Sequence, residues 1–514
     1  MIFTFENFAV FTFAVVLTLL CRAYIRWRKI VAVTPPGPAP LPFIGNLLDI
    51  PTRTPGKTYA AWGRDYGSDL ISVRALAGSL TVVVNTAKAA REIFEKRAFN
   101  YSDRPHYAMV DLMGWDFNLG LMPYGNRWRT SRRMMHQFMH ANVTKAYHPL
   151  LAFKTRALLD NLQRDPDAFL ESLSQYATSI AMSIAYAYDV RPGYDQYVAI
   201  SQKAAAQVSG ALFPGAMIVN AFPALARLPS WFPGTGFHAY AKEARLYTTL
   251  MREAPLAYVQ KEMSAGMAKP SMALTMIEAN EASGGGEEGM RYVKDVTAIA
   301  YIAGSDTTLS TITTFVLAMV LHPTIQRRAQ AELDAVVGRD RLPTFDDRAA
   351  LPYVGAVCRE VLRWKPVTPL GLARRAMYDD EYDGYLIPAG STVHYNTWGI
   401  LHDPDVYHNP ESFKPERFLN ADGSLNADDV SPAFGFGRRI CVGIHLARAS
   451  LWNAVVSILA TLDVTKAKDM HGNEIPVEVD YSNIVISHAK PFKCSIVPRD
   501  AKAAALIHEP DVPV

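Results

Sequence analysis

One short segment near the carboxyl end constrains this chain more than any other part of it. Residues 434–443 read Phe-Gly-Phe-Gly-Arg-Arg-Ile-Cys-Val-Gly, so a single cysteine, Cys441, stands among glycines and arginines. Glycine permits backbone angles and close approaches that a side chain would block, which predicts a tight loop pressed against a flat partner. Arg438 and Arg439 are expected to favour an ionised sulfur, because nearby cations stabilise a thiolate.

The residues after this loop predict a helix. Residues 444–452 are helix-like in composition, which puts Cys441 just before a helix N-terminus, where the helix dipole and free N–H groups stabilise a thiolate. A buried structural cysteine in a turn is the ordinary alternative. Five positions fit the pattern F-x-x-G-x-R-x-C-x-G, namely Phe434, Gly437, Arg439, Cys441 and Gly443. The segment therefore resembles the haem-ligand loop of cytochrome P450.

This resemblance implies both a fold class and a cofactor. The expected fold is the cytochrome P450 fold, which is mainly α-helical with a small β-rich subdomain. By the same resemblance the chain binds haem b (iron protoporphyrin IX), with Cys441 as the ligand of the iron and Phe434 against the cofactor, and it takes O2 as a co-substrate. The similarity covers nearly the whole chain and follows the microsomal, fungal secondary-metabolism type.

A second motif carries a pair of opposite charges. Glu360 and Arg363 form an E-x-x-R pair, and residues three apart lie on one face of a helix. An ordinary surface pair has the same pattern, but the intervals from Arg363 to Pro415 and from Pro415 to Cys441 match the family. The resemblance implies that Glu360, Arg363 and Arg417 form a buried triad with the structural role of holding the cysteine loop.

A long run without proline, from residue 290 to residue 321, predicts a helix of roughly 48 Å at about 1.5 Å per residue. Residues 303–308 in its middle are similar to the A/G-G-x-D/E-T-T/S motif of these monooxygenases. The resemblance implies that Ala303 lies against the haem and that Asp306 and Thr307 deliver protons during oxygen activation. A membrane span is the alternative, but a central Asp306 would cost about 2.5–3.5 kcal/mol there, which favours a buried helix.

The propionates of a haem need cations, and the sequence offers them in three places. Trp128 and Arg132 share one helical face and match the family's W-x-x-x-R motif. Arg439, in the cysteine loop, is the second place. Arg374 is the third, at a position where many relatives carry a histidine that contacts a propionate. We therefore expect these residues to bind the cofactor.

Further cations surround the predicted site. Arg129, Arg133 and Arg438 make a basic cluster on the cysteine side, which favours the encounter with an acidic electron donor. A solvated charge patch is the alternative. The resemblance implies NADPH–cytochrome P450 reductase as the donor, and cytochrome b5 as a further partner. The net charge of +3 gives no case for binding nucleic acid.

The composition agrees with one large catalytic domain, which we place at residues 43–500. Hydrophobic residues make up 49% of the 514 residues and charged residues 20%, as is typical of a globular chain with a sizeable core. Alternating apolar residues at 70–75 and 80–84 predict a small sheet that residues 385–393 continue. The four cysteines have neither disulfide nor metal-finger spacing, which predicts a reducing compartment.

The amino terminus predicts where this domain is located. Residues 1–21 are almost uncharged and precede a run of basic residues, which predicts a signal anchor: one transmembrane helix, with the catalytic domain on the cytosolic side. Residues 22–42 form a basic and proline-rich hinge that resembles endoplasmic-reticulum members of the family. In that single-pass membrane location Asn100 and Asn142 stay unglycosylated despite their acceptor pattern. We expect the tail, residues 501–514, to be frayed.

Positions in the family also indicate a lipophilic substrate. The segments expected around it are mainly apolar, and they are residues 109–117, 208–213, 300–307, 367–372 and 483–486. A terpenoid, steroid-like or polycyclic aromatic molecule fits such a lining. The apolar residues 211–219 and 231–234 predict a lid that dips into the membrane, with packing of a helix end into the core as the alternative.

The leading functional prediction is a monooxygenase that uses NADPH and O2 to insert one oxygen atom into a C–H bond. A reductase-independent haem-thiolate isomerase or dehydratase is one alternative. Such relatives commonly lose the acid–threonine pair, which this chain keeps as Asp306 and Thr307. A non-catalytic haem protein, a carrier or sensor, is the other alternative, and it needs neither that pair nor a basic donor face.

Overall fold

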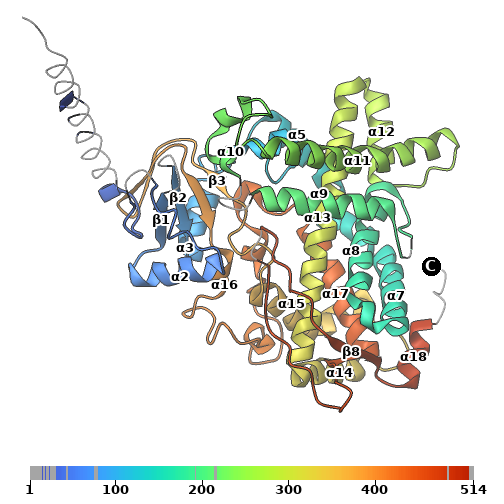
Figure 1. Ribbon diagram of the computed structural model, residues 1–514. Coiled ribbons are helices and arrows are strands. Elements are labelled where there is room, and N and C mark those ends of the chain that lie inside the picture. Colours follow the sequence, from blue (N-terminus) through green and yellow to red (C-terminus); the bar gives the residue numbers. More distant parts are fainter. Residues whose placement is uncertain are drawn as a thin grey trace, which may run out of the picture.

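The computed structural model describes residues 14, 15, 18, 22, 31–41, 44–74, 79–191, 193–212, 217–482 and 485–508. These residues form a large body of helices and three small sheets, and the four-stranded sheet lies at the left of Figure 1. The predicted class, mainly α with a small β-rich part, is therefore confirmed. The predicted anchor, residues 1–21, lies almost wholly outside the described residues, and the division of the chain into domains stays a prediction.

The helices and strands follow one another along the chain with these bounds. The helices are α2 Pro55–Asp65, α3 Ala87–Arg91, α4 Ala108–Leu112, α5 Asn126–Met139, α6 Ala141–Ala146, α7 His148–Arg164, α8 Phe169–Tyr186, α9 Gln196–Leu212, α10 Ile218–Ala221, α11 Phe237–Ser264, α12 Met272–Ser283, α13 Gly286–Leu321, α14 Pro323–Val336, α15 Pro352–Trp364, α16 Thr397–Leu401, α17 Ile444–Thr461 and α18 Ala501–His508. The strands are β1 Leu70–Arg74, β2 Leu80–Val84, β3 Arg374–Arg375, β4 Asp380–Tyr382, β5 Tyr385–Ile387, β6 Thr392–Tyr395, β7 Leu462–Lys466 and β8 Cys494–Pro498.

The main sheet has the order β1-β2-β6-β3, with β1 antiparallel and β6 parallel to β2. Because side chains alternate along a strand, Leu70 and Val82 enter one apolar cluster while Ile71 and Val83 enter another with Tyr59 of α2. Both faces of the sheet are therefore buried. The prediction that residues 385–393 continue this sheet is correct only for its end, since β5 pairs with β4 in a separate hairpin and β6 alone joins β2.

The long helix α13 runs through the middle of the molecule, beside α8 and α17 (Figure 1). It begins at Gly286, four residues before the predicted start, and it is apolar on nearly every side, as a helix packed all round must be. Among the described residues, α13 and α17 are long and apolar enough to cross a membrane, but most of each helix is buried in the protein. This agrees with the predicted buried helix.

The first turn of helix α15 is fixed by a side chain of the neighbouring helix α14. Helix α15 starts with Pro352, a residue suited to a first turn, and the Glu332 carboxylate of α14 accepts the N–H groups of Tyr353 and Val354 at 2.8 and 2.9 Å.

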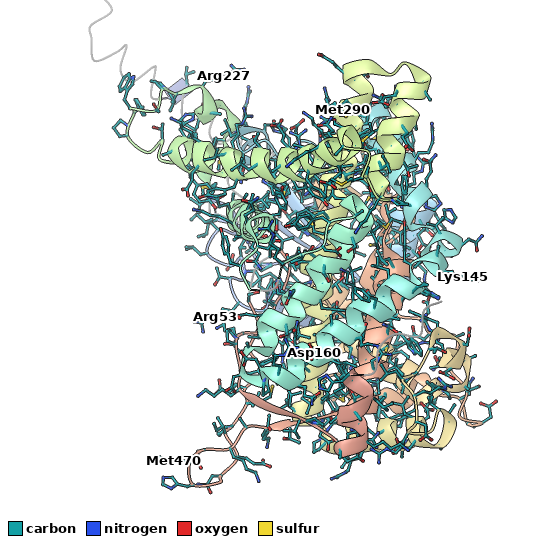
Figure 2. The ribbon with its side chains drawn as sticks, turned by 90° about the vertical axis from the view of Figure 1, so that its right-hand side faces the viewer. Arg53, Lys145, Asp160, Arg227, Met290 and Met470 are labelled. Atoms are coloured by element: carbon teal, nitrogen blue, oxygen red, sulfur yellow. The ribbon has the colours of Figure 1, made fainter. Side chains whose placement is uncertain are left out.

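Figure 2 shows Arg227, in the segment after α10, and Met470, in the loop after β7, at opposite ends of the molecule.

The expectation of a frayed tail is wrong for Ala501–His508, which form α18. The Asp500 carboxylate accepts the Ala503 N–H at 2.8 Å and so caps the helix, and Leu506 and Ile507 are buried against the core. A short amphipathic helix has little sequence signal of its own, and packing stabilises it here. Residues 509–514 lie outside the described part of the chain.

Candidate functional site

The cysteine loop presents Cys441 just before α17, as predicted. The Cys441 N–H donates to the Phe434 carbonyl oxygen at 2.9 Å, which closes the loop. Gly437 has a φ of +56°, and a Cβ at this position would lie 2.0 Å from the Phe94 carbonyl oxygen, so glycine is required. Gly443, the N-cap of α17, has an ordinary φ of −86°, so the backbone angle does not explain its place in the pattern.

The thiol of Cys441 lies in the interior of the molecule, but its side chain is accessible from a cavity. Burial raises the pKa of the Cys441 thiol, while the Gly443 N–H and the Arg132 guanidinium lower it. Arg438 and Arg439, which were expected to favour the thiolate, bond instead to a tyrosine hydroxyl and to three backbone carbonyl oxygens. A bound metal ion deprotonates a coordinating thiol outright, so the binding of iron would itself ionise the Cys441 thiol.

The same cavity is lined by the middle of α13. Ala303 is exposed although most of α13 is buried, because it faces this cavity. The Thr307 hydroxyl donates to the Ala303 carbonyl oxygen, in the preceding turn of α13, at 2.8 Å. Asp306 also lines the cavity, and its Oδ1 lies 3.1 Å from Nε2 of His488. Ala303, Asp306 and Thr307 therefore share one cavity with Cys441.

This cavity has a volume of about 370 Å³, within the range of sites for small molecules. Most of its lining is apolar. Val208, Leu212, Val367, Leu372 and Ile486 come from segments that were expected to contact the substrate. Residues 213, 483 and 484 of those segments lie outside the described residues.

The lining differs from the prediction in two places. Within segment 109–117 only Trp115 reaches the cavity, while Met109 is buried in the core and the contact continues through residues 118–121. Helix α8 also lines the cavity, with Ala177, Ile180, Ala181 and Ile184. An apolar helical stripe looks the same in a sequence whether it faces the core or a cavity, which is why α8 was missed.

Four arginines gather at or beside one side of the cavity: Arg104, Arg132, Arg374 and Arg439. Each donates to backbone carbonyl oxygens, for example Arg132 to Ile440 at 2.8 Å and Arg374 to Phe436 at 3.1 Å. The Trp128 ring contacts two of them, with the guanidinium carbons of Arg439 and Arg132 at 4.2 and 5.5 Å from its centroid. In the described part of the chain none of the four forms an ion pair with a carboxylate.

This cluster has no carboxylate partner among the residues that the structure describes. Burial, together with repulsion between the guanidinium groups, lowers the pKa of Arg439 to about 7 and that of Arg374 to about 9. Buried charges are normally paired, because an unpaired one is costly to desolvate. Nε of Arg104, Nε1 of Trp128 and Nε of Arg374 are also buried without an acceptor among the described residues. The two propionates of a haem fit this cluster, and Cys441 fits its iron.

Arg104 lies where a contact with the cofactor was expected from Arg374. Arg374 is buried but does not line the cavity, so its expected contact with the cofactor stays a prediction. Arg104 does line the cavity, burial lowers its pKa to about 10, and no motif pointed to it. Its sequence context, Ser102-Asp103-Arg104-Pro105, has no periodic or spacing signal that separates it from a surface arginine. Its burial in the fold identifies it.

The three residues of the predicted triad, Glu360, Arg363 and Arg417, are in contact with one another. Arg363 grips Glu360 through two hydrogen bonds of 2.6 and 2.8 Å, and Nε of Arg417 lies 3.3 Å from the same carboxylate. The Lys414 N–H donates to Glu360 Oε1 at 2.6 Å, and Arg363 also donates to the Leu401 carbonyl oxygen at 2.9 Å. Glu360 and Arg363 are fully buried. The triad thus ties α15 to the chain that leads to the cysteine loop.

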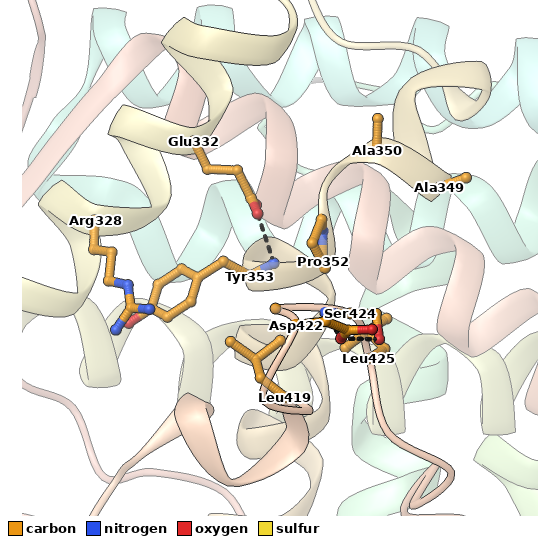
Figure 3. Close-up of a pocket in the computed structure, with 11 residues that line it drawn as sticks. Arg328, Glu332, Ala349, Ala350, Pro352, Tyr353, Leu419, Asp422, Ser424 and Leu425 are labelled. Carbon is orange, nitrogen blue, oxygen red and sulfur yellow. Dashed lines mark hydrogen bonds between the residues drawn. The ribbon is translucent and has the colours of Figure 1, made fainter.

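A second hollow, of about 660 Å³, lies near the surface between α14, α15 and residues 419–425 (Figure 3). The Arg328 guanidinium stacks over the Tyr353 ring at 4.3 Å, and the exposed Asp422 lies on the opposite wall. None of the predicted site residues lines this hollow, so the buried cavity beside Cys441 is the candidate site.

Comparison with known proteins agrees with this geometry. The family model "Cytochrome P450" matches residues 35–494. A cytochrome P450 monooxygenase of Armillaria gallica is 40% identical, with 98% of this chain and 99% of that protein covered. A cytochrome P450 monooxygenase of Postia placenta is 40% identical over 96% of both chains. The tryptamine 4-monooxygenase of Psilocybe cyanescens is 36% identical, with 93% and 96% covered.

Proposed function

Because the chain belongs to the cytochrome P450 family and is a P450 monooxygenase, we propose that it hydroxylates a lipophilic secondary metabolite with electrons from NADPH. The single observation that carries the proposal is the shared cavity, which Cys441 and the pair Asp306 and Thr307 line together. The family implies haem, O2 and a redox partner.

Each group in the cavity has one task in this proposal. When bound, haem would supply the iron that activates O2, with Cys441 as its ligand from the protein. Trp128, Arg132 and Arg439 would hold its propionates, and Phe434 lines the cavity with the cysteine ligand. Thr307 keeps its hydroxyl on α13 through the bond to the Ala303 carbonyl, and Asp306 holds the proton that oxygen activation consumes.

The retained acid–threonine pair supports a monooxygenase over an isomerase or dehydratase, which needs no proton delivery and no reductase. It also supports catalysis over a haem carrier or sensor. Both alternatives predict that removing Thr307 or Asp306 leaves the protein's chemistry unchanged. A monooxygenase predicts loss of coupling between electron supply and product.

The lining supports a neutral, lipophilic substrate, such as a terpenoid or polycyclic compound. Its charged residues are Arg104, Arg132, Arg439 and Asp306, and we assign the three arginines to the cofactor and the acid to proton delivery. No charged side chain of the described lining is then left to pair with a charged substrate. The polar groups that remain, including Asn118, Ser209 and Thr311, are able to orient a hydroxyl or a carbonyl group.

We further propose that the enzyme is a single-pass protein of the endoplasmic-reticulum membrane, supplied by NADPH–cytochrome P450 reductase and, in addition, cytochrome b5. Apolar side chains support a membrane-facing surface after α9, since Trp231 is 79% exposed and Ile218 is 53% exposed. The exposed cations Arg129, Arg133 and Arg438 support an acidic donor on the cysteine side.

The test of the enzymatic proposal uses full-length protein in membranes with reductase, NADPH and a panel of lipophilic candidates. We expect products heavier by one oxygen atom. Reduced protein under carbon monoxide should show the red-shifted Soret band of a thiolate adduct, and Cys441→Ser should abolish it. For Thr307→Ala, product per NADPH should fall while hydrogen peroxide rises to match. Unchanged coupling in Thr307→Ala and in Asp306→Asn would favour the reductase-independent alternative.

The test of the location uses glycosylation. Asn100 accepts the N–H groups of Met377 and Tyr378 and donates to a carbonyl, so a glycan there would break the fold. Asn142 is exposed and is therefore the informative site. An unmodified Asn142 in the native protein is expected, and a glycan on Asn142 would reverse the proposed topology.

A further inference from the structure

Residues 481, 482 and 485–489 lie along a polar stripe of α13. Asp306, Ser310 and Thr314 are spaced by four residues and so share one face of the helix. Ser310 donates to the Ser487 carbonyl oxygen at 2.6 Å, and the Thr314 and Tyr481 hydroxyls lie 3.0 Å apart. The first position of the stripe, Asp306, meets His488 at 3.1 Å. Asp306, the proposed catalytic acid, therefore belongs to a row of contacts between α13 and residues 481, 487 and 488.

The backbone around His488 is fixed from both sides. Its N–H donates to the Ser482 hydroxyl at 2.9 Å, and the Ser482 N–H donates back to the His488 carbonyl oxygen at 2.8 Å. The preceding residue, Ser487, donates its N–H to the Val367 carbonyl oxygen at 2.8 Å. These bonds place the imidazole against Asp306 independently of the ion pair itself.

The two partners have different surroundings. Asp306 lines the cavity, whereas His488 does not, although 27% of its side chain is exposed. Part of the imidazole is therefore accessible to water. Imidazole is the side chain best suited to exchange protons with water near neutral pH.

Resting on the function proposed above, we propose that His488 is the positioning residue of Asp306 and carries protons to it from solvent. A hydronium ion of the solvent gives its proton to Nδ1 and becomes water, and the Nε2 proton passes to Oδ1 of the ionised Asp306. The ring is then neutral and regains its first tautomer by exchange with water. When Asp306 gives its proton to the cavity, one proton has moved inward and no bond between heavy atoms has changed.

The test compares His488→Ala and His488→Gln in the haem-loaded, full-length enzyme. Glutamine keeps a neutral N–H donor near Asp306 but carries no exchangeable acid proton. We expect both variants to lose product per NADPH several-fold, with more hydrogen peroxide and a larger solvent isotope effect, and with an unchanged substrate-induced spectral shift. Coupling restored to the wild-type level in His488→Gln would overturn the relay.

Two matched controls remove neighbouring contacts of the same stripe without touching Asp306. Tyr481→Phe deletes the hydroxyl next to Thr314, and Ser310→Ala deletes the donor to Ser487. We expect wild-type coupling in both. If they reproduce the loss seen in His488→Ala, the imidazole is merely an anchor of the segment and the proposal is overturned.

A readout without turnover tests the contact itself. Thermal unfolding of His488→Gln, Asp306→Asn and the double variant should be non-additive, because each single change alters the same contacting pair of side chains. Additive shifts would overturn the proposal. A wild-type enzyme that oxygenates nothing would instead remove the proposed function, and the relay with it. An active wild type with unaffected His488 variants would remove the relay alone.

Discussion

Two buried clusters of charge in this molecule differ in whether the protein completes them. In the triad, the Glu360 carboxylate receives Arg363, Arg417 and a backbone N–H, so every charge has a partner. In the cluster beside the cavity, Arg104 and Arg439 have backbone carbonyl oxygens but no carboxylate among the described residues. The charges of the triad are paired within the protein. The arginines beside the cavity have no carboxylate partner in the described part of the chain, so an anionic ligand would complete that cluster.

This difference separates a structural from a cofactor-binding role without any motif. A self-sufficient network stabilises the fold whether or not a ligand is present. A cluster of like charges opposes folding until a ligand with the opposite charge binds, and then it contributes to the affinity for that ligand. The two clusters should therefore respond differently to mutation and to haem.

The largest effect is expected from breaking the complete cluster. Glu360→Ala leaves Arg363 buried without its partner, which should lower the free energy of unfolding by about 3–5 kcal/mol. Denaturant unfolding, with and without haem, measures it, and the loss should be similar in both states. Lys57→Ala, which breaks the exposed pair with Glu411, is the control and should cost about 0–1 kcal/mol. A stable, haem-loaded Glu360→Ala with altered turnover alone would contradict the structural role.

A smaller effect, of opposite sign in the two states, is expected from the incomplete cluster. Arg104→Leu removes a buried cation that repels Arg374 and Arg439, so the haem-free protein should be unchanged or more stable by about 1 kcal/mol. In the loaded protein a propionate loses its partner, and haem should dissociate roughly tenfold faster, equivalent to about 1.4 kcal/mol. Transfer of haem to an acceptor protein measures the rate. Destabilisation of the haem-free protein would show that Arg104 is structural.

The sequence predicted the complete cluster better than the incomplete one, for a physical reason. Glu360 and Arg363 are held at fixed spacing by one helix, so a pattern of four letters determines their geometry. Arg104 lies in a loop, and its place beside the cavity depends on contacts with residues far away in the chain, such as Leu372. No local pattern encodes such a contact. The same limit explains why α8 was missed as a wall of the cavity.

Acid should weaken the protein near both clusters, because each has a buried neutral histidine. Burial lowers the pKa of His402, near Arg363, to about 3 and that of His394, near Arg104, to about 4, from the ordinary 6.5. Below pH 6.5 the unfolded chain therefore binds protons that the folded chain does not. Stability present above pH 6.5 should be lost as the pH falls towards 4, by at most about 1.4 kcal/mol per pH unit for each histidine.

Single variants assign that acid sensitivity to one cluster or the other. His402→Asn keeps a side-chain N–H for the Trp398 carbonyl oxygen, which His402 contacts at 2.9 Å, and should flatten the slope between pH 6.5 and 4. Bound haem should reduce the loss of stability in acid that is due to His394, because a propionate offsets the charge of Arg104. It should leave the loss due to His402 unchanged. A slope that survives in both histidine variants would place its origin in other groups.

The smallest effect on stability is expected from the exposed cations, which complete the comparison. Arg438 donates to the Tyr124 hydroxyl at 2.7 Å and Arg129 lies 5.4 Å from the centroid of the same ring, so both keep contact with water and neither needs an anion. Arg438→Ala should change the free energy of unfolding by no more than about 0.5 kcal/mol and should leave haem in place.

If these residues guide an acidic donor, the variant should instead slow reduction by the reductase at low salt, and added salt should erase the difference, because it screens the charge. Stopped-flow reduction measured across a salt series gives both quantities. A defect that persists at high salt would mean that Arg438 acts on the cysteine loop and belongs with the buried cluster.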